Sequence, residues 1–278
     1  MAKTKIFNVD AGESFVDVLA EHFLNEYKEH PDALAEVLFL LPNRRACQSL
    51  SDAFVRLHGL VPTILPQIKP IAETEEDEVF LTGNNIAVLK KMQPEISKTE
   101  RILIFTRLIM QKPTELGLSS LSLSQAYALA KNLADLMDLA YNENLDFSRL
   151  QSIVPSEYAV HWQENLKLLN IITEFWPKIL VEKNKIDAAY RRKVLLSEEL
   201  KIWRQTQTKQ KIVVAGTTAA FPIMKELVQT VLELPNGEVW LYGLDICLED
   251  SGWAQIDENH PQFELKELLD YLKIERSS

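Results

Sequence analysis

Cysteine is scarce in this sequence. Among 278 residues there are two, Cys47 and Cys247, which stand 200 positions apart. Neither belongs to a C-x-x-C pair or to a cluster of histidine and cysteine. This pattern is typical of proteins from a reducing compartment, so we expect no disulfide bond and no structural zinc site.

Long apolar runs are also missing. No stretch of roughly 18 uncharged apolar residues occurs, so the sequence predicts no membrane-spanning helix. Two lysines, Lys3 and Lys5, precede the first apolar run. Polar residues soon interrupt that run (Asn8, Asp10 and Glu13). It therefore lacks the form of a secretory signal peptide, and we expect a cytoplasmic protein.

Positive charge is outweighed by negative charge. The chain has 30 Lys and Arg residues against 40 Asp and Glu residues, which gives a formal net charge of -10. Such a protein does not attract nucleic acid over its whole surface, so any DNA or RNA binding has to use a local basic patch. Hydrophobic residues make up 46% of the chain, enough for a substantial core in one large domain or two smaller ones.

The apolar residues that are present form short runs of strand length near both ends of the chain. Residues 37–41, VLFLL, and 211–216, KIVVAG, are continuous runs of the kind found in parallel strands covered on both faces. A short strand also opens residues 6–23, and EVWLYGLD, residues 238–245, predicts another after a PNG turn. We therefore expect an α/β fold with a parallel sheet.

Amphipathic helices are expected between these strands. One begins after Ser14, a candidate N-cap paired with Asp17, and another begins after Asn43, also a candidate N-cap. A third begins at Pro222, which suits the first turn of a helix. The side chains expected to face the core are Phe15, Val18, Leu19 and Phe23 in the first helix and Leu50, Ala53, Phe54 and Leu57 in the second.

The middle of the chain has a different pattern. Three prolines in residues 61–80 limit strand pairing, so the sheet is expected to pause there, and the acidic run Glu73 to Glu78 is most simply a solvated loop. From about residue 86 to 207 the periodicity is that of helices. One apolar stripe, explained by helix packing, comprises Ala126, Leu129, Ala130, Leu133, Met137 and Ala140. The expected parts are residues 1–85, a helical insertion 86–207, and 208–278.

The first strand and helix have the outline of a phosphate-binding loop without its chemistry. A P-loop, G-x-x-x-x-G-K-[ST], needs glycines to wrap the phosphates, a lysine for their charge and a hydroxyl for Mg²⁺. The corresponding position here is Gly12, Glu13 and Ser14, and no Lys or Arg occurs between Lys5 and Lys28. We therefore expect no nucleotide to bind at this degenerate position.

An acidic residue that ends a buried strand would be the second part of such a site, because it holds Mg²⁺. The strongest candidate strand ends in Ala215 and Gly216, and Asp245 is the nearest substitute. A single carboxylate at a strand end is more often a helix cap or a loop ligand. ATP hydrolysis is accordingly not expected, and the chain also has no G-x-S-x-G elbow.

The order of these segments resembles the N-terminal half of the AddB family, the helicase-like and nuclease subunit of AddAB helicase–nucleases for double-strand break repair. The segments that carry the resemblance are LLPNRRACQSLSDAFVR, LPQIKPIAETEEDEVF, VVAGTTAAFPIMKELVQTVLELPNGEVWLYGLD and WAQIDENHPQFELKELL. It implies a RecA-like, P-loop NTPase-like parallel sheet, split by an all-helical insertion as in superfamily 1 helicases, with degenerate ATPase motifs. It also implies two partners, DNA and an AddA-like ATPase/nuclease subunit.

Complete members of that family carry a nuclease domain, often with an iron–sulfur cluster, far to the C-terminal side. The chain shows no such motif and no cysteine cluster. We therefore expect a fragment without the nuclease, with no catalytic residue, no cofactor and no metal.

Candidate DNA contacts lie where strands lead into helices. Arg44 and Arg45 begin the helix after residues 37–41, where free N–H groups and two cations together favour a phosphate. Two solvated or ion-paired arginines are an equally good interpretation. Asn43 and Arg56 are secondary candidates.

Two weaker candidates lie elsewhere in the sequence. Thr217 and Thr218 follow the strand 211–216, where hydroxyl groups bind phosphate or simply cap the turn. The segment KNKIDAAYRRKVLL interleaves cations with an aromatic residue, a pattern that suits base stacking beside phosphates or an ordinary solvated helix face. Its candidates are Tyr190, Arg191 and Arg192. His260 has no ligand spacing around it and is interpreted as structural.

Three functions remain open at this point. The first is a non-catalytic scaffold that guides DNA beside an ATP-driven subunit. The second is a structural domain whose acidic surface docks on a basic protein. The third is a nucleotide-hydrolysing motor with an atypical site at Ser14 and Asp245.

Overall fold

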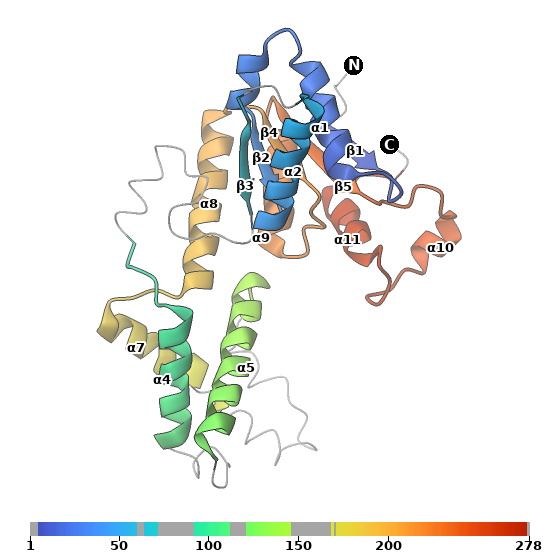
Figure 1. The fold of residues 1–278 in the computed structure, drawn as a ribbon. Helices are drawn as coiled ribbons and strands as arrows, with labels where there is room; N and C mark the ends of the chain where they lie inside the picture. The colour runs from blue at the N-terminus through green and yellow to red at the C-terminus, as the bar shows by residue number, and fades with distance from the viewer. Residues whose placement is uncertain are drawn as a thin grey trace. The chain divides into compact units, whose positions relative to one another are not determined.

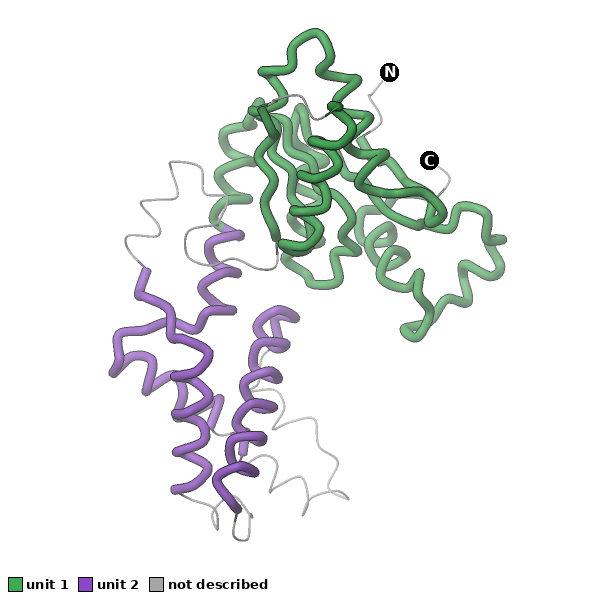
Figure 2. Tube along the Cα trace, in the orientation of Figure 1, with its two compact units in different colours: residues 1–83, 198–278 green, residues 84–197 purple. Residues whose placement is uncertain are grey.

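The computed structural model describes residues 5–59, 64–71, 92–111, 121–145, 168–169 and 171–276. The chain forms two compact units (Figure 2). The first combines residues 1–83 with 198–278, and the second comprises residues 84–197. The borders suggested by the sequence were 85/86 and 207/208. The structure places the second border at 197/198, inside helix α8 (Ala188–Thr206), so this helix belongs in part to each unit.

The first unit contains a five-stranded, all-parallel sheet with the strand order β1-β5-β4-β2-β3 (Figure 1). Its strands are β1 (Ile6–Val9), β2 (Leu38–Leu41), β3 (Gln67–Pro70), β4 (Ile212–Ala215) and β5 (Gly237–Tyr242). The two strands from the end of the chain, β5 and β4, thus lie between β1 and β2 from its start. The prediction of an α/β fold with a parallel sheet is confirmed.

The prediction that the sheet pauses in residues 61–80 is wrong for strand β3. Leu38 pairs with Gln67, and the register continues to Leu41 and Pro70. The amides of Gln67 and Ile71 donate to the carbonyls of Val37 and Leu41, at 2.9 and 2.7 Å. Since alternate residues of a strand face the neighbour, the nitrogen of Pro70 falls on the outer side of this edge strand, where no donor is needed. The acidic run 73–78 lies outside the described residues.

Helices cover both faces of the sheet. Helices α1 (Phe15–Glu26) and α2 (Arg44–Leu57) pack against each other on one face, and α9 (Pro222–Glu233) packs on β4 and β5 from the other (Figure 1). Parallel connections are right-handed, so connections that cross the sheet in opposite directions lie on opposite faces. The remaining helices of this unit are η1 (Pro31–Glu36), α10 (Asp250–Ala254) and α11 (Phe263–Leu272), and α11 contacts α9.

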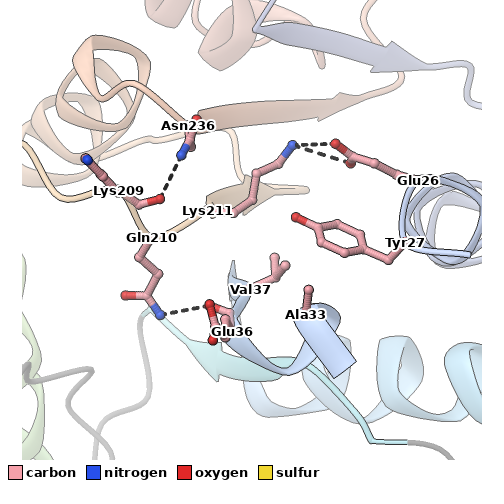
Figure 3. A pocket seen from close by; sticks show the side chains of 9 residues that line it. All are labelled: Glu26, Tyr27, Ala33, Glu36, Val37, Lys209, Gln210, Lys211 and Asn236. Carbon is pink, nitrogen blue, oxygen red and sulfur yellow. Dashed lines mark hydrogen bonds and ion pairs between the residues drawn. The ribbon is translucent and has the colours of Figure 1, made fainter. Parts of the chain in front are cut away.

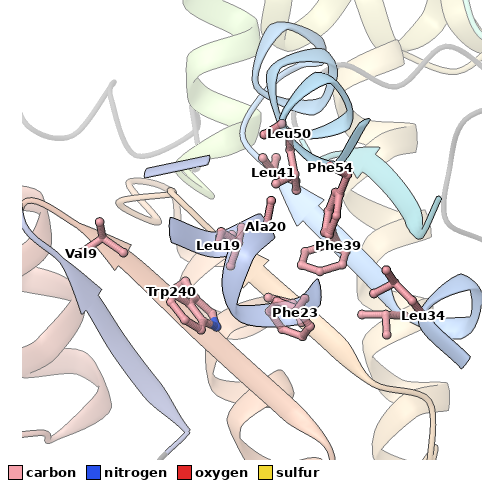
Figure 4. Packing of buried hydrophobic residues seen from close by; sticks show 14 residues of the cluster. Val9, Leu19, Ala20, Phe23, Leu34, Phe39, Leu41, Leu50, Phe54 and Trp240 are labelled. Atoms are coloured by element: carbon pink, nitrogen blue, oxygen red, sulfur yellow. The ribbon is translucent and has the colours of Figure 1, made fainter. Parts of the chain in front are cut away.

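An aromatic cluster fills the space between the sheet and the α1/α2 layer (Figure 4). Phe39 of β2 contacts Phe23 of α1 edge-on, with ring centroids 4.8 Å apart, and Phe54 of α2 at 5.7 Å. Trp240 of β5 extends the cluster across the sheet and stacks on Phe7 of β1 at 4.6 Å. Burial of these large side chains provides the main driving force for this layer, since each buries on the order of 150–250 Å².

The predicted start of α9 at Pro222 is confirmed, and the two predicted side-chain caps have different outcomes. Asn43 is the N-cap of α2, because its Oδ1 accepts a hydrogen bond of 2.9 Å from the amide of Ala46. Ser14 occupies the N-cap position of α1, but its side chain makes no capping bond to the described residues, so a hydroxyl cap there is wrong. Leu57 was expected in the core and is 40% exposed, because it belongs to the last turn of α2.

The second unit is helical. Its described elements are α4 (Lys98–Gln111), α5 (Leu123–Asn142), the π-helical turn η4 (Ile171–Phe175), α7 (Trp176–Lys183) and the start of α8. Ser122 and Gln125 form a capping box at the start of α5. The predicted apolar stripe of α5 is buried apart from Leu129, which is half-buried, and it packs with Phe105 of α4 and with Trp176. Helix packing as the explanation of that stripe is confirmed.

A buried ion pair lies inside the second unit. Nη1 of Arg101 donates to Oδ1 of Asp187 at 3.0 Å, and both of its terminal nitrogens donate to Asp138, at 2.6 and 2.7 Å. The indole N–H of Trp176 donates to Asp187 at 3.1 Å. Burial alone would lower the pKa of Arg101, but the bonds to Asp138 and Asp187 raise it above its usual range. Arg101 is therefore charged at neutral pH.

Among the described residues, no helix is long and apolar enough to cross a lipid bilayer. Neither Cys47 nor Cys247 forms a disulfide bond.

Candidate functional site

All parallel strands of the first unit end at the same side of the sheet, which we call the carboxyl edge. It comprises residues 10–14 after β1, 42–45 after β2, 216–219 after β4 and 243–245 after β5. Open α/β sheets bind ligands at this edge. Most residues that the sequence singled out in this unit lie here.

The turn after β1 is closed by the protein itself. The amide of Glu13 donates to the carbonyl of Asp10 at 3.0 Å, so this N–H does not face outward as it would in a phosphate cradle. The hydroxyl of Tyr242, at the end of β5, donates to the carbonyl of Ala11 at 3.1 Å. The side chains of Asp10 and Glu13 add two exposed acids to the same turn. This arrangement disfavours a bound phosphate.

The place between this turn and the end of β4 is occupied by an aromatic side chain. The ring of Phe15 lies over Gly216, where an added Cβ would be 3.0 Å from its Cε1 atom. Phe15 also contacts the ring of Tyr242, with centroids 5.3 Å apart. Gly216 has a φ of 68°, which favours glycine. Phe15 was expected only as a core residue of α1, and no pattern in the sequence indicates this contact with a distant strand end.

Asp245 serves as a loop cap. Its Oδ1 accepts hydrogen bonds from the amides of Cys247 and Leu248, both at 2.9 Å. Its own amide donates to Oε1 of Gln262 at 3.0 Å. These bonds agree with the expectation that a single carboxylate at a strand end caps a loop, here the loop after β5. They leave the atypical nucleotide site at Ser14 and Asp245 without geometric support.

Two amide side chains that sequence reasoning missed hold the same loop. Asn8 of β1 bonds both backbone groups of Leu244, donating to its carbonyl and accepting from its amide, each at 3.0 Å. Gln262 donates to the carbonyl of Gly243 at 2.8 Å. The signal for Asn8 was present, because it is a polar residue inside a four-residue strand.

Arg44 and Arg45 lie at the carboxyl edge as predicted by their position after β2. They are the first two residues of α2, both are exposed, and the first turn contains no acidic residue. Asn43 is also exposed but uses its side chain to cap Ala46. Backbone N–H groups and the helix dipole at this end favour an anion.

Arg56 does not join this pair. It lies in the last turn of α2, roughly 16 Å of helix beyond Arg45. Its guanidinium forms an ion pair with Asp17 of α1. Arg56 therefore connects two helices, and we remove it from the candidate contacts.

The two threonines after β4 are engaged within the protein. Oγ1 of Thr217 accepts a hydrogen bond of 3.1 Å from the amide of Ala219, so it caps its own turn. The hydroxyl of Thr218 donates to the carboxylate of Glu264 on α11. An acid bonded to Thr218 repels a phosphate, so capping is the better explanation of both residues.

The basic segment of the second unit is largely neutralised. Arg191 is 8% exposed and forms an ion pair with Glu95 at 3.8 Å, so its expected contact with DNA is wrong. Arg192 is half-buried, while Tyr190 is exposed and contacts the ring of Tyr141 at 5.7 Å. Arg191 lies on the buried face of α8, and the spacing of the cations alone did not indicate which face is buried.

Charge is also balanced beside that segment. Lys183 and Lys185 both bond Glu100, at 3.0 and 2.8 Å. Hydrogen bonds from Lys185 and Lys183 lower the pKa of Glu100 below its usual value.

In the first unit, His260 accepts a hydrogen bond from the amide of Gln262 at 3.1 Å, as a structural loop residue would.

Charges thus separate along the carboxyl edge. The turns after β1 and β5 carry Asp10, Glu13 and Asp245, and the turn after β2 carries Arg44 and Arg45. The described ranges contain no group of three or more His, Cys, Asp or Glu side chains that could hold a metal ion. The start of α2 is therefore the part of this edge best suited to an anion.

Comparison of the chain with models of protein families finds no match, and comparison with curated proteins finds none either.

Proposed function

We propose that this chain is a non-catalytic, helicase-like scaffold that guides DNA in an AddAB-type helicase–nuclease for double-strand break repair. In this proposal the first unit is a RecA-like core and the second unit is its helical insertion. A separate ATP-driven subunit supplies the motor. The observation that carries the proposal is the exposed pair Arg44 and Arg45 at the start of α2, on the ligand-binding edge of a parallel sheet.

Phosphate is the ligand that this position fits best. The helix start supplies N–H groups and a partial positive charge, and the two guanidinium groups add donors that match phosphate oxygens. Such contacts hold a nucleic-acid backbone without reading its sequence. The chain carries a net charge of -10, so a local contact of this kind is the form that DNA binding takes here.

The rest of the edge favours a scaffold over a motor. Phe15 lies over Gly216, Tyr242 bonds the carbonyl of Ala11, and Asp245 caps its own loop. A motor would need these same places for a nucleotide and its Mg²⁺. The contacts within the protein therefore support a core in which the nucleotide site is filled by side chains.

Fluorescence anisotropy with labelled single-stranded DNA, and with a duplex that carries an overhang, tests this function directly. We expect binding that weakens as salt concentration rises and that is the same with and without ATP. Binding that depends on ATP would favour a motor. Absence of binding at low salt, together with co-purification with an AddA-like subunit, would favour the partner-docking alternative.

A further inference from the structure

The hollow at the amino-terminal edge of the sheet, opposite the carboxyl edge, has a balanced charge (Figure 3). Its volume is about 280 Å³, and its lining contains two acids, Glu26 and Glu36, and two cations, Lys209 and Lys211. Nζ of Lys211 pairs with Glu26 at 3.2 Å. Nδ2 of Asn236 donates to the carbonyl of Lys209 at 2.7 Å. The hollow is therefore a polar junction between the turns before β4 and β5, and its charge favours neither an anion nor a cation.

At the carboxyl edge, by contrast, two acids of α11 bind polar groups of the segment that follows β4. The carboxylate of Glu264 accepts a hydrogen bond from the hydroxyl of Thr218, in the turn after β4. Three residues further along α11, Glu267 pairs with Nζ of Lys225, near the start of α9, at 2.9 Å. Residues three apart are neighbours on a helix surface, so the two carboxylates lie side by side. The hydroxyl of Thr218 and the ammonium group of Lys225, which we call the covered pair, therefore also lie side by side.

Apolar contacts hold α11 in this position. Its side chains Leu265, Leu268 and Leu269 are buried, and the helix contacts α9 (Figure 1). The side chain of Glu267 is 47% exposed, whereas that of Lys225 is only 16% exposed. Since buried leucines rather than the two acids anchor the helix, the acids can be neutralised without detaching α11 from the first unit.

The covered pair has the chemistry of a phosphate contact. Hydroxyl and ammonium groups bind phosphate oxygens, and here they bind the oxygens of another anionic group, a carboxylate. The pair also lies close to the exposed arginines. Strand β4 is the neighbour of β2, and adjacent strands are about 4.8 Å apart. The turn that carries Thr218 therefore lies beside the turn that leads to Arg44 and Arg45.

We propose that Glu264 and Glu267 form an autoinhibitory contact that keeps Thr218 and Lys225 from binding a phosphate group. The two carboxylates neutralise the ammonium group and repel a second anion. Once they are neutralised or displaced, the covered pair adds a phosphate contact beside the one at the start of α2. This inference rests on the function proposed above in so far as the phosphate belongs to DNA, and the contact itself is testable without DNA.

Fluorescence anisotropy of the full chain with labelled single-stranded DNA tests the proposal through the variant Glu264→Gln/Glu267→Gln. Glutamine keeps an acceptor oxygen for Thr218 and Lys225 and removes only the charge. We expect binding about three- to tenfold tighter than that of the unmodified chain, as two partly exposed charges are lost. The slope of log K against log salt should steepen by about 0.7, the value for one added phosphate contact on a single strand. Adding Lys225→Gln to this variant should abolish the gain.

A matched control separates this effect from the general loss of negative charge. Glu249→Gln/Glu258→Gln removes the same charge from two exposed acids in the same part of the chain and should leave the slope unchanged. An equal gain in the control, or a gain that persists after Lys225→Gln, would overturn the proposal.

Nuclear magnetic resonance titration of the full chain with inorganic pyrophosphate separates this inference from the proposed function. The backbone amide signals of Thr218 and Ala219 should shift saturably in Glu264→Gln/Glu267→Gln, and the shifts should be much smaller in the unmodified chain. Such shifts in a protein that binds no DNA would support the autoinhibitory contact and contradict the proposed function. Absence of the shifts in the variant, or equal shifts in the unmodified chain, would overturn the autoinhibitory contact whether or not DNA binds.

Discussion

The ring of Phe15, at the start of α1, lies directly against Gly216, at the end of β4. A methyl group at Gly216 would lie 3.0 Å from Cε1 of Phe15, and the backbone there has a φ of 68°. Two segments far apart in the sequence thus meet at the point where a nucleotide-binding fold would hold phosphate. The turn after β1 has the outline of a P-loop, but the ring of Phe15 occupies the space beside it in which a phosphate would lie.

Gly216→Ala should therefore destabilise the first unit by about 2 kcal/mol. Left-handed backbone costs a non-glycine residue about 1 to 2 kcal/mol, and the contact with Phe15 adds to it. Chemical denaturation followed by circular dichroism measures the change. Gly12→Ala is the matched control, because a Cβ there meets no atom within 4 Å, and its effect should stay within about 0.5 kcal/mol. Equal losses in the two variants would refute the contact.

Asp245 should behave as a loop cap in stability measurements. Asp245→Asn keeps an acceptor oxygen for the amides of Cys247 and Leu248 and should change stability little, whereas Asp245→Ala should cost about 1 to 2 kcal/mol. Calorimetry of the unmodified chain with millimolar Mg-ATP should show no binding. Nucleotide binding that Asp245→Asn abolishes would instead identify this residue as a metal ligand.

Arg101→Met should destabilise the second unit by about 3 to 5 kcal/mol, because it leaves the buried carboxyl group of Asp187, whose pKa burial already raises, without its cationic partner. Lys98→Met on the same helix is a suitable control, since its pair with Asp135 at 3.7 Å is exposed and should contribute less than about 1 kcal/mol. Denaturant midpoints of the two variants give the comparison. A small effect of Arg101→Met would show that the buried ion pair contributes little to stability.

Stability should fall between pH 10 and pH 12. Burial raises the pKa of Tyr141 from 10.0 to about 12, so in this range the folded chain holds a proton that the unfolded chain has lost. The corresponding loss is about 2 to 3 kcal/mol by pH 12. Tyr141→Phe should remove this part of the pH dependence. An identical alkaline profile for the variant would show that Tyr141 ionises normally in the folded state.

The buried strands were predictable, while the edge strand β3 was not. Strands β2 and β4 are covered on both faces and consist entirely of apolar residues, which is a signal that sequence alone carries. Strand β3 has one neighbour, tolerates Pro70 and has the sequence QIKP, so no apolar run marks it. Its pairing depends on the exposed edge of β2, a tertiary feature.

The candidate site was predictable where local sequence signals place a residue and not where tertiary packing does. The position of Arg44 and Arg45 follows from a strand end and the helix cap at Asn43, both of which are local signals. Arg191 was misassigned because its burial depends on which face of α8 packs inward, and the cation spacing does not determine that face. The contact of Phe15 with Gly216 joins distant segments and required the fold.

The central claim is tested most directly by the salt dependence of DNA binding in an Arg44→Ala/Arg45→Ala variant. Anisotropy with labelled single-stranded DNA should show weaker binding, and the slope of log K against log salt should decrease by about 1 to 1.5, as expected when two phosphate contacts are lost. Lys28→Ala/Lys131→Ala removes the same charge from two exposed lysines elsewhere and should leave the slope unchanged. Unaltered affinity and slope in the arginine variant would contradict the account.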